Sequence, residues 1–338
     1  MLKKYLLLLL LILLLLSVGG VVLSQSPNDL VSCRDFAFST EEDFLSRGPV
    51  PPDGNPIISD GDLLGKNHAV CMRNRDLLDV HDVDPSIDLG LDAADVLYID
   101  RKLVAFSTSL DAPGKRFTAG DLLTTWGAVI PNQALLVQFQ IHGDRGLDAV
   151  HFVGDWEHII AFNSFAIDVP RGAWLENPGL LVDTLRRYNI DIWFSIEGTE
   201  QIASTVPVYD GDLLSAAYGV VVARNEQLLP PSVPAGIQTG GVDFGLDAFT
   251  ASRMFNPNEL KPAAGHFSTE ILYRGEQKFT DGDVLRVGDG IAYHDSDLTA
   301  PFEPFADFLG TDAIYILLDE PPELDFLPMI LKYLRGGG

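Results

Sequence analysis

Hydrophobic residues in this chain come in short runs, each only a few residues long and separated by turn-forming residues. Val104 to Thr108 is one example, a run of aliphatic and aromatic residues that ends in Ser and Thr. Short runs of this kind bounded by Gly, Pro, Asp and Ser are typical of β-strands. Four runs share an aromatic-serine ending and predict equivalent strands at residues 36–40, 104–108, 192–195 and 266–269.

Two polar phrases recur between these runs. Gly-Asp-Leu-Leu, with Val in its last copy, stands at residues 61–64, 120–123, 211–214 and 282–285. Gly-Leu-Asp-Ala, with Thr in its last copy, stands at residues 90–93, 146–149, 245–248 and 310–313. The two phrases alternate in the same order throughout. Repetition at a spacing of tens of residues is the signature of a repeat architecture.

Each repeat unit predicts four short strands. They are a Leu-Asp-Ala strand, an aromatic-serine strand, a Gly-Asp-Leu-Leu strand and a Leu-rich strand such as Gln133–Val137 or Glu226–Leu229. Four strands per unit describe the blade of a β-propeller. A solenoid would need polar capping units at both ends, and the chain shows none. The fold class predicted is therefore all-β, a propeller of four four-stranded blades, or five.

The chain ends favour ring closure. The chain enters at an aromatic-serine strand, Phe36–Thr40, that has no Leu-Asp-Ala strand before it, and it leaves just after one, Asp312–Leu318. Each end supplies what the other lacks, so we expect both termini to complete one blade. Closing the ring in this way protects sheet edges.

One spacing departs from the repeat. The distance in sequence from Asp148 to Asp247 is nearly twice that from Asp92 to Asp148. This stretch contains an additional candidate strand at Ile160–Ser164, which indicates either a blade with an insertion or a fifth, decayed blade. The segment Leu180–Tyr188 has a helical pattern.

The two ends of the chain differ in character from residues 25–320, the predicted propeller domain. Lys3 and Lys4, an apolar run and small residues up to Ser24 follow the layout of a signal peptide, so residues 1–24 are expected to be removed. Left uncleaved, the same run would be a membrane anchor. Leu30–Cys33 resembles a lipoprotein box but lies too far from the apolar run.

Residues 321–338 have apolar positions at helical spacing and predict a short docked helix, the alternative being an exposed helix for a partner or a membrane.

Composition points to an exported protein. Export would favour a disulfide between Cys33 and Cys71, the two cysteines of the chain, although two buried thiols remain an alternative. The formal net charge of -25 repels phosphate backbones, which excludes nucleic acid, and it also disfavours contact with anionic membranes except through a retained leader. The expected location is secreted or in the cell envelope.

The repeated phrases resemble those of secreted bacterial repeat proteins of β-propeller type that have no characterised function. The resemblance covers roughly Phe36 to Leu318, and its units combine Leu-Asp-Ala, Phe-Ser and Gly-Asp-Leu-Leu. The Gly-Gly doublets of kelch proteins and the Trp-Asp ends of WD40 proteins are missing at regular positions. No catalytic residue is carried over from the resemblance.

The repeated aspartates are the first candidate chemistry. Asp beside Gly commonly caps a turn, and we favour this role for both sets. The alternative concerns the Leu-Asp-Ala copies, which would ring a central channel and bind Ca²⁺, a cation that prefers carboxylate oxygens. The chain has no EF-hand loop. The predicted metal ligands under this alternative are Asp92, Asp148, Asp247 and Asp312.

Other candidates are weaker. His151 and the phrase Gly154–His158 are rich in polar groups, but repeat alignment predicts a hairpin turn there, and a zinc site would need a third ligand. The serines of the aromatic-serine strands recur, whereas a nucleophile would be unique. Glu41, Glu197 and Glu270 are interpreted as solvated strand ends.

The leading functional hypothesis is a secreted, non-enzymatic binding module for a protein or glycan, with an optional structural cation. The alternative is a hydrolase or lyase with a site over the channel. That site would use non-repeated residues: His151, Asp155, Glu157, His158 and Arg186 or Arg187. A third hypothesis is a structural component of the cell envelope.

Overall fold

The computed structural model describes residues 30–201, 207–262, 264–306 and 309–319. The predicted leader, residues 1–24, and the predicted C-terminal helix, residues 321–338, lie outside the described residues.

The described chain is built mainly from antiparallel sheet, as the sequence predicts, in four four-stranded sheets and one two-stranded sheet. Sheet 1 has the order β18 (Ile314–Ile316), β1 (Phe36–Phe38), β4 (Leu63–Gly65), β5 (Ala69–Met72). Sheet 2 has the order β6 (Ala94–Tyr98), β7 (Leu103–Phe106), β8 (Leu122–Thr124), β9 (Val129–Ile130). Sheet 3 has the order β10 (Val150–Val153), β11 (Asp191–Phe194), β12 (Leu213–Ser215), β13 (Val220–Ala223). Sheet 4 has the order β14 (Ala248–Ala251), β15 (Gly265–Ser268), β16 (Val284–Arg286), β17 (Ile291–Tyr293). The two-stranded sheet pairs β2 (Phe44–Leu45) with β3 (Ile57–Ile58).

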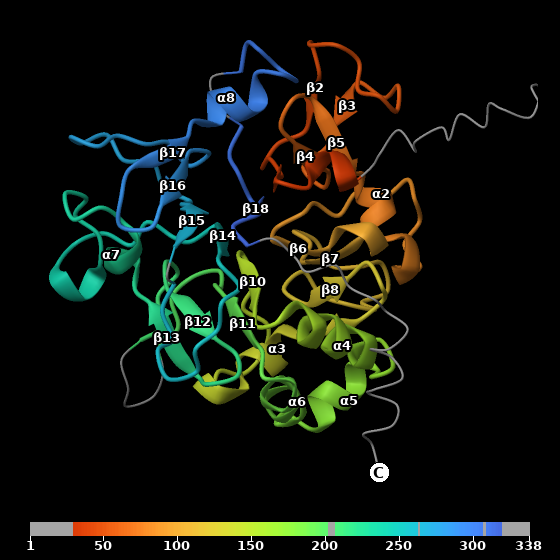
Figure 1. Cartoon of the computed structure of the whole chain (residues 1–338), viewed down its shortest axis with the longest axis vertical. Coiled ribbons are helices and arrows are strands. Elements are labelled where there is room, and N and C mark those ends of the chain that lie inside the picture. The colour runs from red at the N-terminus through yellow and green to blue at the C-terminus, as the bar shows by residue number, and fades with distance from the viewer. Residues whose placement is uncertain (1–29, 202–206, 263, 307–308, 320–338) are drawn as a thin grey trace, which may run out of the picture.

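The four sheets meet through their first strands. β6 contacts β10 and β18, and β14 contacts the same two strands, so the four first strands form a closed circuit of neighbours. Figure 1 shows these strands around the centre of the molecule, with the other strands of each sheet farther out.

A repeated serine joins each sheet to the next. The hydroxyl of Ser195 donates to the Leu246 carbonyl at 2.7 Å, and three equivalent bonds join the other pairs of sheets. They are Ser107 to Leu147 at 2.8 Å, Ser268 to Thr311 at 2.9 Å and Ser39 to Leu91 at 3.4 Å. Each hydroxyl reaches the carbonyl just before the repeated Asp of the following unit, which gives the recurring serine a structural role.

Both chain ends contribute to sheet 1, as predicted. β1 pairs with β18, with Phe36 opposite Ile316. The predicted disulfide is confirmed: Cys33, in the 3₁₀ helix η1 (Leu30–Cys33), is bonded to Cys71 of β5 with their Cα atoms 5.7 Å apart. A structural disulfide indicates an oxidising, extracytoplasmic environment. No helix in the part of the chain described has the length and apolarity needed to cross a bilayer.

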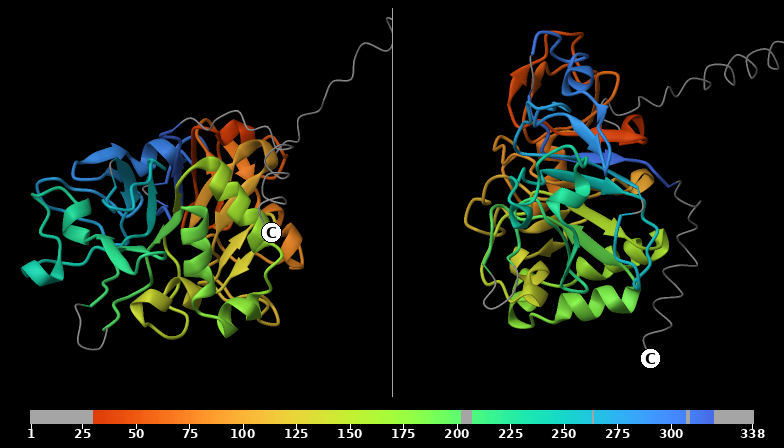
Figure 2. Two further views of the ribbon diagram at one scale, coloured as in Figure 1. Left: turned by 60° about the horizontal axis from the view of Figure 1, so that its bottom comes forward. Right: turned by 90° about the vertical axis from the view of Figure 1, so that its left-hand side faces the viewer.

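The long spacing in the middle of the chain is a helical insertion in sheet 3. Three helices, α4 (Trp156–Ala166), α5 (Arg171–Glu176) and α6 (Leu180–Tyr188), lie between β10 and β11. In Figure 2 they form the green group on one side of the body. The strand predicted at Ile160–Ser164 is therefore wrong, and the helix at Leu180–Tyr188 is confirmed. A short apolar run does not distinguish a buried helix from a strand.

The Leu-rich fourth strand of each unit is also a wrong prediction. Gln133–Val137 and Glu226–Leu229 fall on short helices, and the fourth strand is instead the apolar run that directly precedes them. The equivalent helices are α2 (Asn74–Leu77), α3 (Asn132–Leu135), α7 (Asn225–Leu228) and α8 (Asp295–Thr299). Further 3₁₀ turns are η2 (Asp79–His81), η3 (Ile99–Arg101), η4 (Val137–Phe139) and η5 (Ile237–Thr239).

The aromatic residues of the repeated strands form the core. Phe38, Phe106, Phe194 and Phe267 have 0% exposure. Burying a Phe contributes about 1.5–3 kcal/mol, so these four positions explain why the aromatic-serine strand recurs.

Candidate cation site and the opposite pocket

The aspartates of the Gly-Asp-Leu-Leu phrase cap turns, as the favoured interpretation predicts. Asp62 accepts hydrogen bonds from the backbone N–H of Ser59 at 3.1 Å and of Asn74 at 3.0 Å. The first bond closes the turn before the strand, and the second holds the start of α2. Asp121, Asp212 and Asp283 each accept the same turn-closing bond.

Each of these turn aspartates also has a basic side chain beside it. Arg73 contacts Asp62 at 2.6 Å, and Arg224 pairs with Asp212. His294 lies 3.3 Å from Asp283. In sheet 2 the position equivalent to Arg73 is Pro131, and Arg171 of the inserted helix α5 supplies the guanidinium instead, 2.6 Å from Asp121. Arg171 of the helical insertion thus supplies the positive charge that sheet 2 lacks at Pro131.

The aspartates of the Leu-Asp-Ala phrase are arranged differently. Asp92, Asp148, Asp247 and Asp312 stand just before the four inner strands, each at the N-terminal end of its strand. Carboxylate oxygens of Glu41, Asp247 and Asp312 lie within 4.8 Å of one another, and so do those of Asp92, Asp148 and Glu197. A third such group joins Asp148, Asp210 and Glu270. We call the four aspartates with Glu41, Glu197 and Glu270 the carboxylate ring.

The sequence predicts that the three glutamates are solvated strand ends. Their side chains are exposed at the surface, yet they also fold back onto the aspartates. The repeated glycine before each Asp makes room for this contact. Gly146 has a φ of +72°, and a Cβ there would lie 2.5 Å from the Glu197 carboxyl carbon. In sheet 2 the place of the glutamate is taken by Ser109, which faces Gly90.

The carboxylate ring concentrates negative charge without an internal partner. Asp148 is 4% exposed and Asp247 8%, and the Oδ2 atom of each is buried with no hydrogen-bond partner among the described residues. No Lys, Arg or His within the described ranges forms an ion pair with any of the four aspartates. An unpaired buried carboxylate is costly unless it is neutralised by a proton or a cation.

The pKa values express the same imbalance. Burial, together with repulsion from Glu41, raises the pKa of Asp312 to about 9. Burial and repulsion from Asp210 raise the pKa of Glu270 to about 8, and burial with repulsion from Glu197 raises that of Asp92 to about 7. The pKa values of Asp148 and Asp247 are raised well above the usual range for the same causes. The ring therefore favours protons in the absence of a metal.

The donor set fits a hard divalent cation. Ca²⁺ binds oxygen at about 2.3–2.6 Å, so two oxygens bound to one ion lie at most about 5 Å apart. The oxygens of each group meet this condition. A zinc site is not supported, because none of the groups found among the described residues contains His or Cys.

The next buried polar positions along the inner strands are not repeated. Three residues after the ring aspartates stand Asp95, His151, Thr250 and Tyr315. Arg253 enters from the far end and binds Asp95 through two hydrogen bonds of 2.9 and 2.6 Å. It also donates to the carbonyls of Phe152 and Val96.

These buried groups have fixed charges. Burial alone would raise the pKa of Asp95, but the charge of Arg253 holds it well below its usual range. His151 lies 3.4 Å from Asp95 and is 1% exposed, and burial lowers its pKa while Asp95 raises it. Beside Asp95 the protein therefore provides its own cation, the Arg253 guanidinium.

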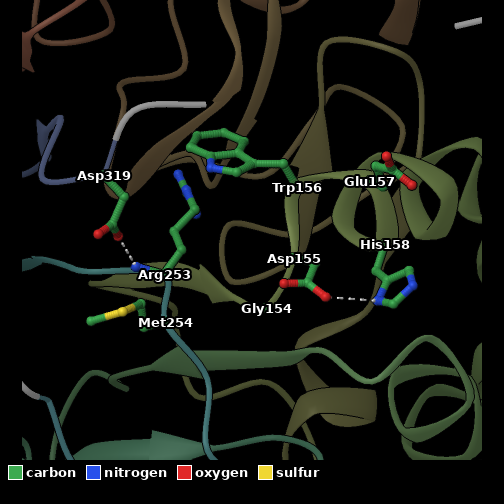
Figure 3. Close-up of a pocket in the computed structure, with 8 residues that line it drawn as sticks. All are labelled: Gly154, Asp155, Trp156, Glu157, His158, Arg253, Met254 and Asp319. Atoms are coloured by element: carbon green, nitrogen blue, oxygen red, sulfur yellow. Dashed lines mark hydrogen bonds and ion pairs between the residues drawn. The ribbon is translucent and has the colours of Figure 1, made fainter. Parts of the chain in front are cut away.

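A pocket of about 510 Å³ opens beside Arg253, on the side away from the carboxylate ring. In Figure 3 the Trp156 ring lies over the Arg253 guanidinium, and Asp319 accepts a hydrogen bond from the Arg253 backbone N–H at 2.5 Å. Asp155 and His158 form the other wall, 3.7 Å apart. The full lining is Gly154, Asp155, Trp156, Glu157, His158, Arg253, Met254 and Asp319.

This pocket corrects one prediction and contains part of another. Gly154–His158 is not a hairpin turn between two strands, because helix α4 begins at Trp156. Three of the residues named for a hydrolase or lyase, Asp155, Glu157 and His158, line the pocket. His151 lies buried beneath it. Neither arginine belongs to it: Arg186 donates to the Ala217 carbonyl and Arg187 stacks on Phe165.

Comparisons with family models, with curated proteins and with solved structures find no match to this chain. The resemblance to secreted repeat proteins therefore rests on the repeated phrases alone. Functional inference starts from the geometry of the site.

Proposed function

We propose that the chain is an exported binding module on a four-bladed β-propeller, and that the carboxylate ring binds Ca²⁺ as part of its binding surface. The observation that carries this proposal is the pair Asp148 and Asp247, buried in the ring with an unpartnered oxygen on each.

The propeller is supported by three features of the described residues. Each of the four sheets starts at the centre and proceeds outward strand by strand. The four inner strands contact one another in a closed circuit. A repeated serine bond joins each sheet to the next at all four boundaries. Four sheets without a fifth among the described residues favour four blades.

The binding role follows from calcium coordination. Ca²⁺ takes six to eight oxygen ligands. A group of three carboxylates leaves part of that shell open, and the glutamates lie at the exposed rim of the ring. An oxygen of a protein or glycan ligand would complete the shell. The excess of acidic residues in the chain attracts the cation over long range.

Thermal unfolding of the full chain in Ca²⁺ and in chelator tests this proposal. A cation that binds only the folded state raises the free energy of unfolding by mass action, by about 2.7 kcal/mol at a concentration of 100 Kd. The unfolding temperature rises accordingly. We expect this shift in the native chain and its loss in Asp148→Asn. The control is Glu176→Gln, an exposed carboxylate on α5, which should keep the full shift. An equal unfolding temperature with and without Ca²⁺ would exclude the cation site.

A second candidate function is a hydrolase or lyase at the pocket of Figure 3. It is favoured by one observation, a cavity lined by non-repeated acid and imidazole side chains. Assay against a panel of chromogenic glycosides and esters, with His158→Ala and Glu157→Gln as variants, tests it. Turnover that both variants abolish would support the enzyme, and turnover that neither changes would exclude this pocket.

A further inference from the structure

We infer that the carboxylate ring holds two cations rather than one, at opposite boundaries between sheets. One lies between sheets 4 and 1, bound by Glu41, Asp247 and Asp312. The other lies between sheets 2 and 3, bound by Glu197, Asp92 and Asp148. This inference rests on the proposed function and specifies its metal centre.

The two groups are equivalent in construction and share no residue. Each contains the aspartates of two adjacent sheets and the glutamate of the second of them. In each, the three carboxylate oxygens lie within 4.8 Å of one another, close enough for one Ca²⁺ to touch all three.

Each group has its own reason to take a cation. Asp247 belongs to the first group and Asp148 to the second, and each has a buried Oδ2 atom with no partner among the described residues. A single ion in one group would leave the other buried carboxylate uncompensated. Burial of an unpaired charge is what makes such a position costly.

One ion on the channel axis fits the geometry less well. Such an ion would have to reach all four aspartates together, yet the oxygens found within 4.8 Å of one another in the described part of the chain form groups of three. Two cations placed off the axis would each be reached by the three carboxylate oxygens of one group.

The remaining two boundaries are less suited to independent ions. Between sheets 3 and 4, Glu270 and Asp210 form a group only by sharing Asp148 with the second site. Between sheets 1 and 2 the glutamate is replaced by Ser109. The fourfold repeat is thereby reduced to two complete sites.

Calcium titration of the full chain by calorimetry, with native mass spectrometry for stoichiometry, tests this inference. We expect two ions bound to the native chain. Glu41→Gln should bind one ion and Glu197→Gln should bind one, with the affinity of the affected site at least tenfold weaker. Glu176→Gln should bind two. Thermal unfolding in chelator checks that each variant is folded. A folded variant should unfold at or above the unfolding temperature of the native chain, because losing a ring carboxylate removes repulsion.

The outcomes separate the two proposals. Binding of one ion by the native chain, lost in both glutamate variants, would overturn the two-cation inference and leave the calcium proposal standing. Binding of three ions would overturn it by making the group of Glu270 an independent site. Absence of calcium binding would overturn both.

Discussion

Buried carboxylates at the two ends of the inner strands are compensated in opposite ways. At the far end Asp95 is 1% exposed and is matched by Arg253 through two short hydrogen bonds. At the near end Asp148 and Asp247 are almost equally buried, and no basic side chain among the described residues reaches them. On β6, Asp95 follows the ring aspartate Asp92 by only three positions.

The difference shows where the protein is complete and where it depends on its surroundings. Asp95 is ionised because its counter-ion is built into the chain, so its pKa is depressed. Burial and repulsion from neighbouring carboxylates raise the pKa values of Asp148 and Asp247, and no basic side chain among the described residues offsets them. A buried carboxylate paired inside the protein makes a structural contact, whereas an unpaired one is the basis of the proposed cation site.

Removing the internal cation should have the largest effect. Arg253→Met would leave Asp95 buried without a partner, and we expect a loss of about 3–5 kcal/mol in the free energy of unfolding, measured by urea denaturation. Arg286→Met is the control, because Arg286 and its partner Asp289 are both exposed and losing their ion pair should cost less than about 1 kcal/mol. Similar losses in the free energy of unfolding for the two variants would show that the buried Arg253–Asp95 pair contributes no more than an exposed ion pair.

Neutralising the opposite end should have the reverse sign. In chelator at neutral pH, Asp247→Asn should stabilise the protein by on the order of 1 kcal/mol, since it removes a buried carboxyl that must otherwise bind a proton or repel its neighbours. In saturating Ca²⁺ the same variant should be less stable than the native chain. Destabilisation in both conditions, measured by urea denaturation, would contradict this account of the ring.

A smaller effect is expected where one repeat differs from the others at the first helical residue. Asn74, Asn132 and Asn225 donate through Nδ2 to a carbonyl of the Gly-Leu-Asp-Ala phrase, while the fourth unit has Asp295. Burial raises the pKa of Asp295 to about 7, with Asp283 and Asp281 adding repulsion. Asp295→Asn restores the donor, so we expect a gain of roughly 1 kcal/mol at pH 8.

The pH dependence of that gain follows from the direction of the pKa shift. A carboxyl whose folded pKa is raised contributes its full stability below its unfolded pKa, and that contribution is lost as pH rises through about 7. The advantage of Asn over Asp should therefore be absent near pH 4, grow as pH rises toward 7 and be complete above neutral pH. Urea denaturation at both values measures it, and a gain that is constant with pH would contradict the protonation of Asp295.

The smallest expected effect concerns the serine bonds behind the carboxylate ring. Ser195→Ala removes a buried bond of 2.7 Å and should cost about 1 kcal/mol, whereas Ser39→Ala removes one of 3.4 Å and should cost less. Both serines are fully buried, so the pair is a matched comparison. Equal losses in thermal unfolding would show that bond geometry does not distinguish the boundaries.

Repetition made much of the fold predictable from sequence. The order of the first three strands of each unit, the pairing of the terminal strands and the Cys33–Cys71 disulfide follow from phrases that recur or from residue types with few options. The repeated Gly-Asp turns also behave as residue chemistry predicts, because an Asp carboxylate and nearby backbone N–H groups are a local interaction.

The errors arise where tertiary structure decides between local alternatives. Ile160–Ser164 has strand-like residues, but it packs as a helix against the inner strand β6. The glutamates of the ring could not be assigned from sequence, because their contact with the aspartates depends on left-handed glycines in neighbouring loops. The Arg253–Asp95 pair joins residues far apart in the chain, and no repeated phrase marks it.

The pairing of Phe36 with Ile316 also sets an order in time. A strand near the start of the chain remains without its inner neighbour until nearly all of the described chain has been synthesised. Contacts of such long sequence separation form slowly, because loop closure costs entropy before the contact is made. The pairing of β1 with β18 in sheet 1 is therefore expected to be a late step in folding.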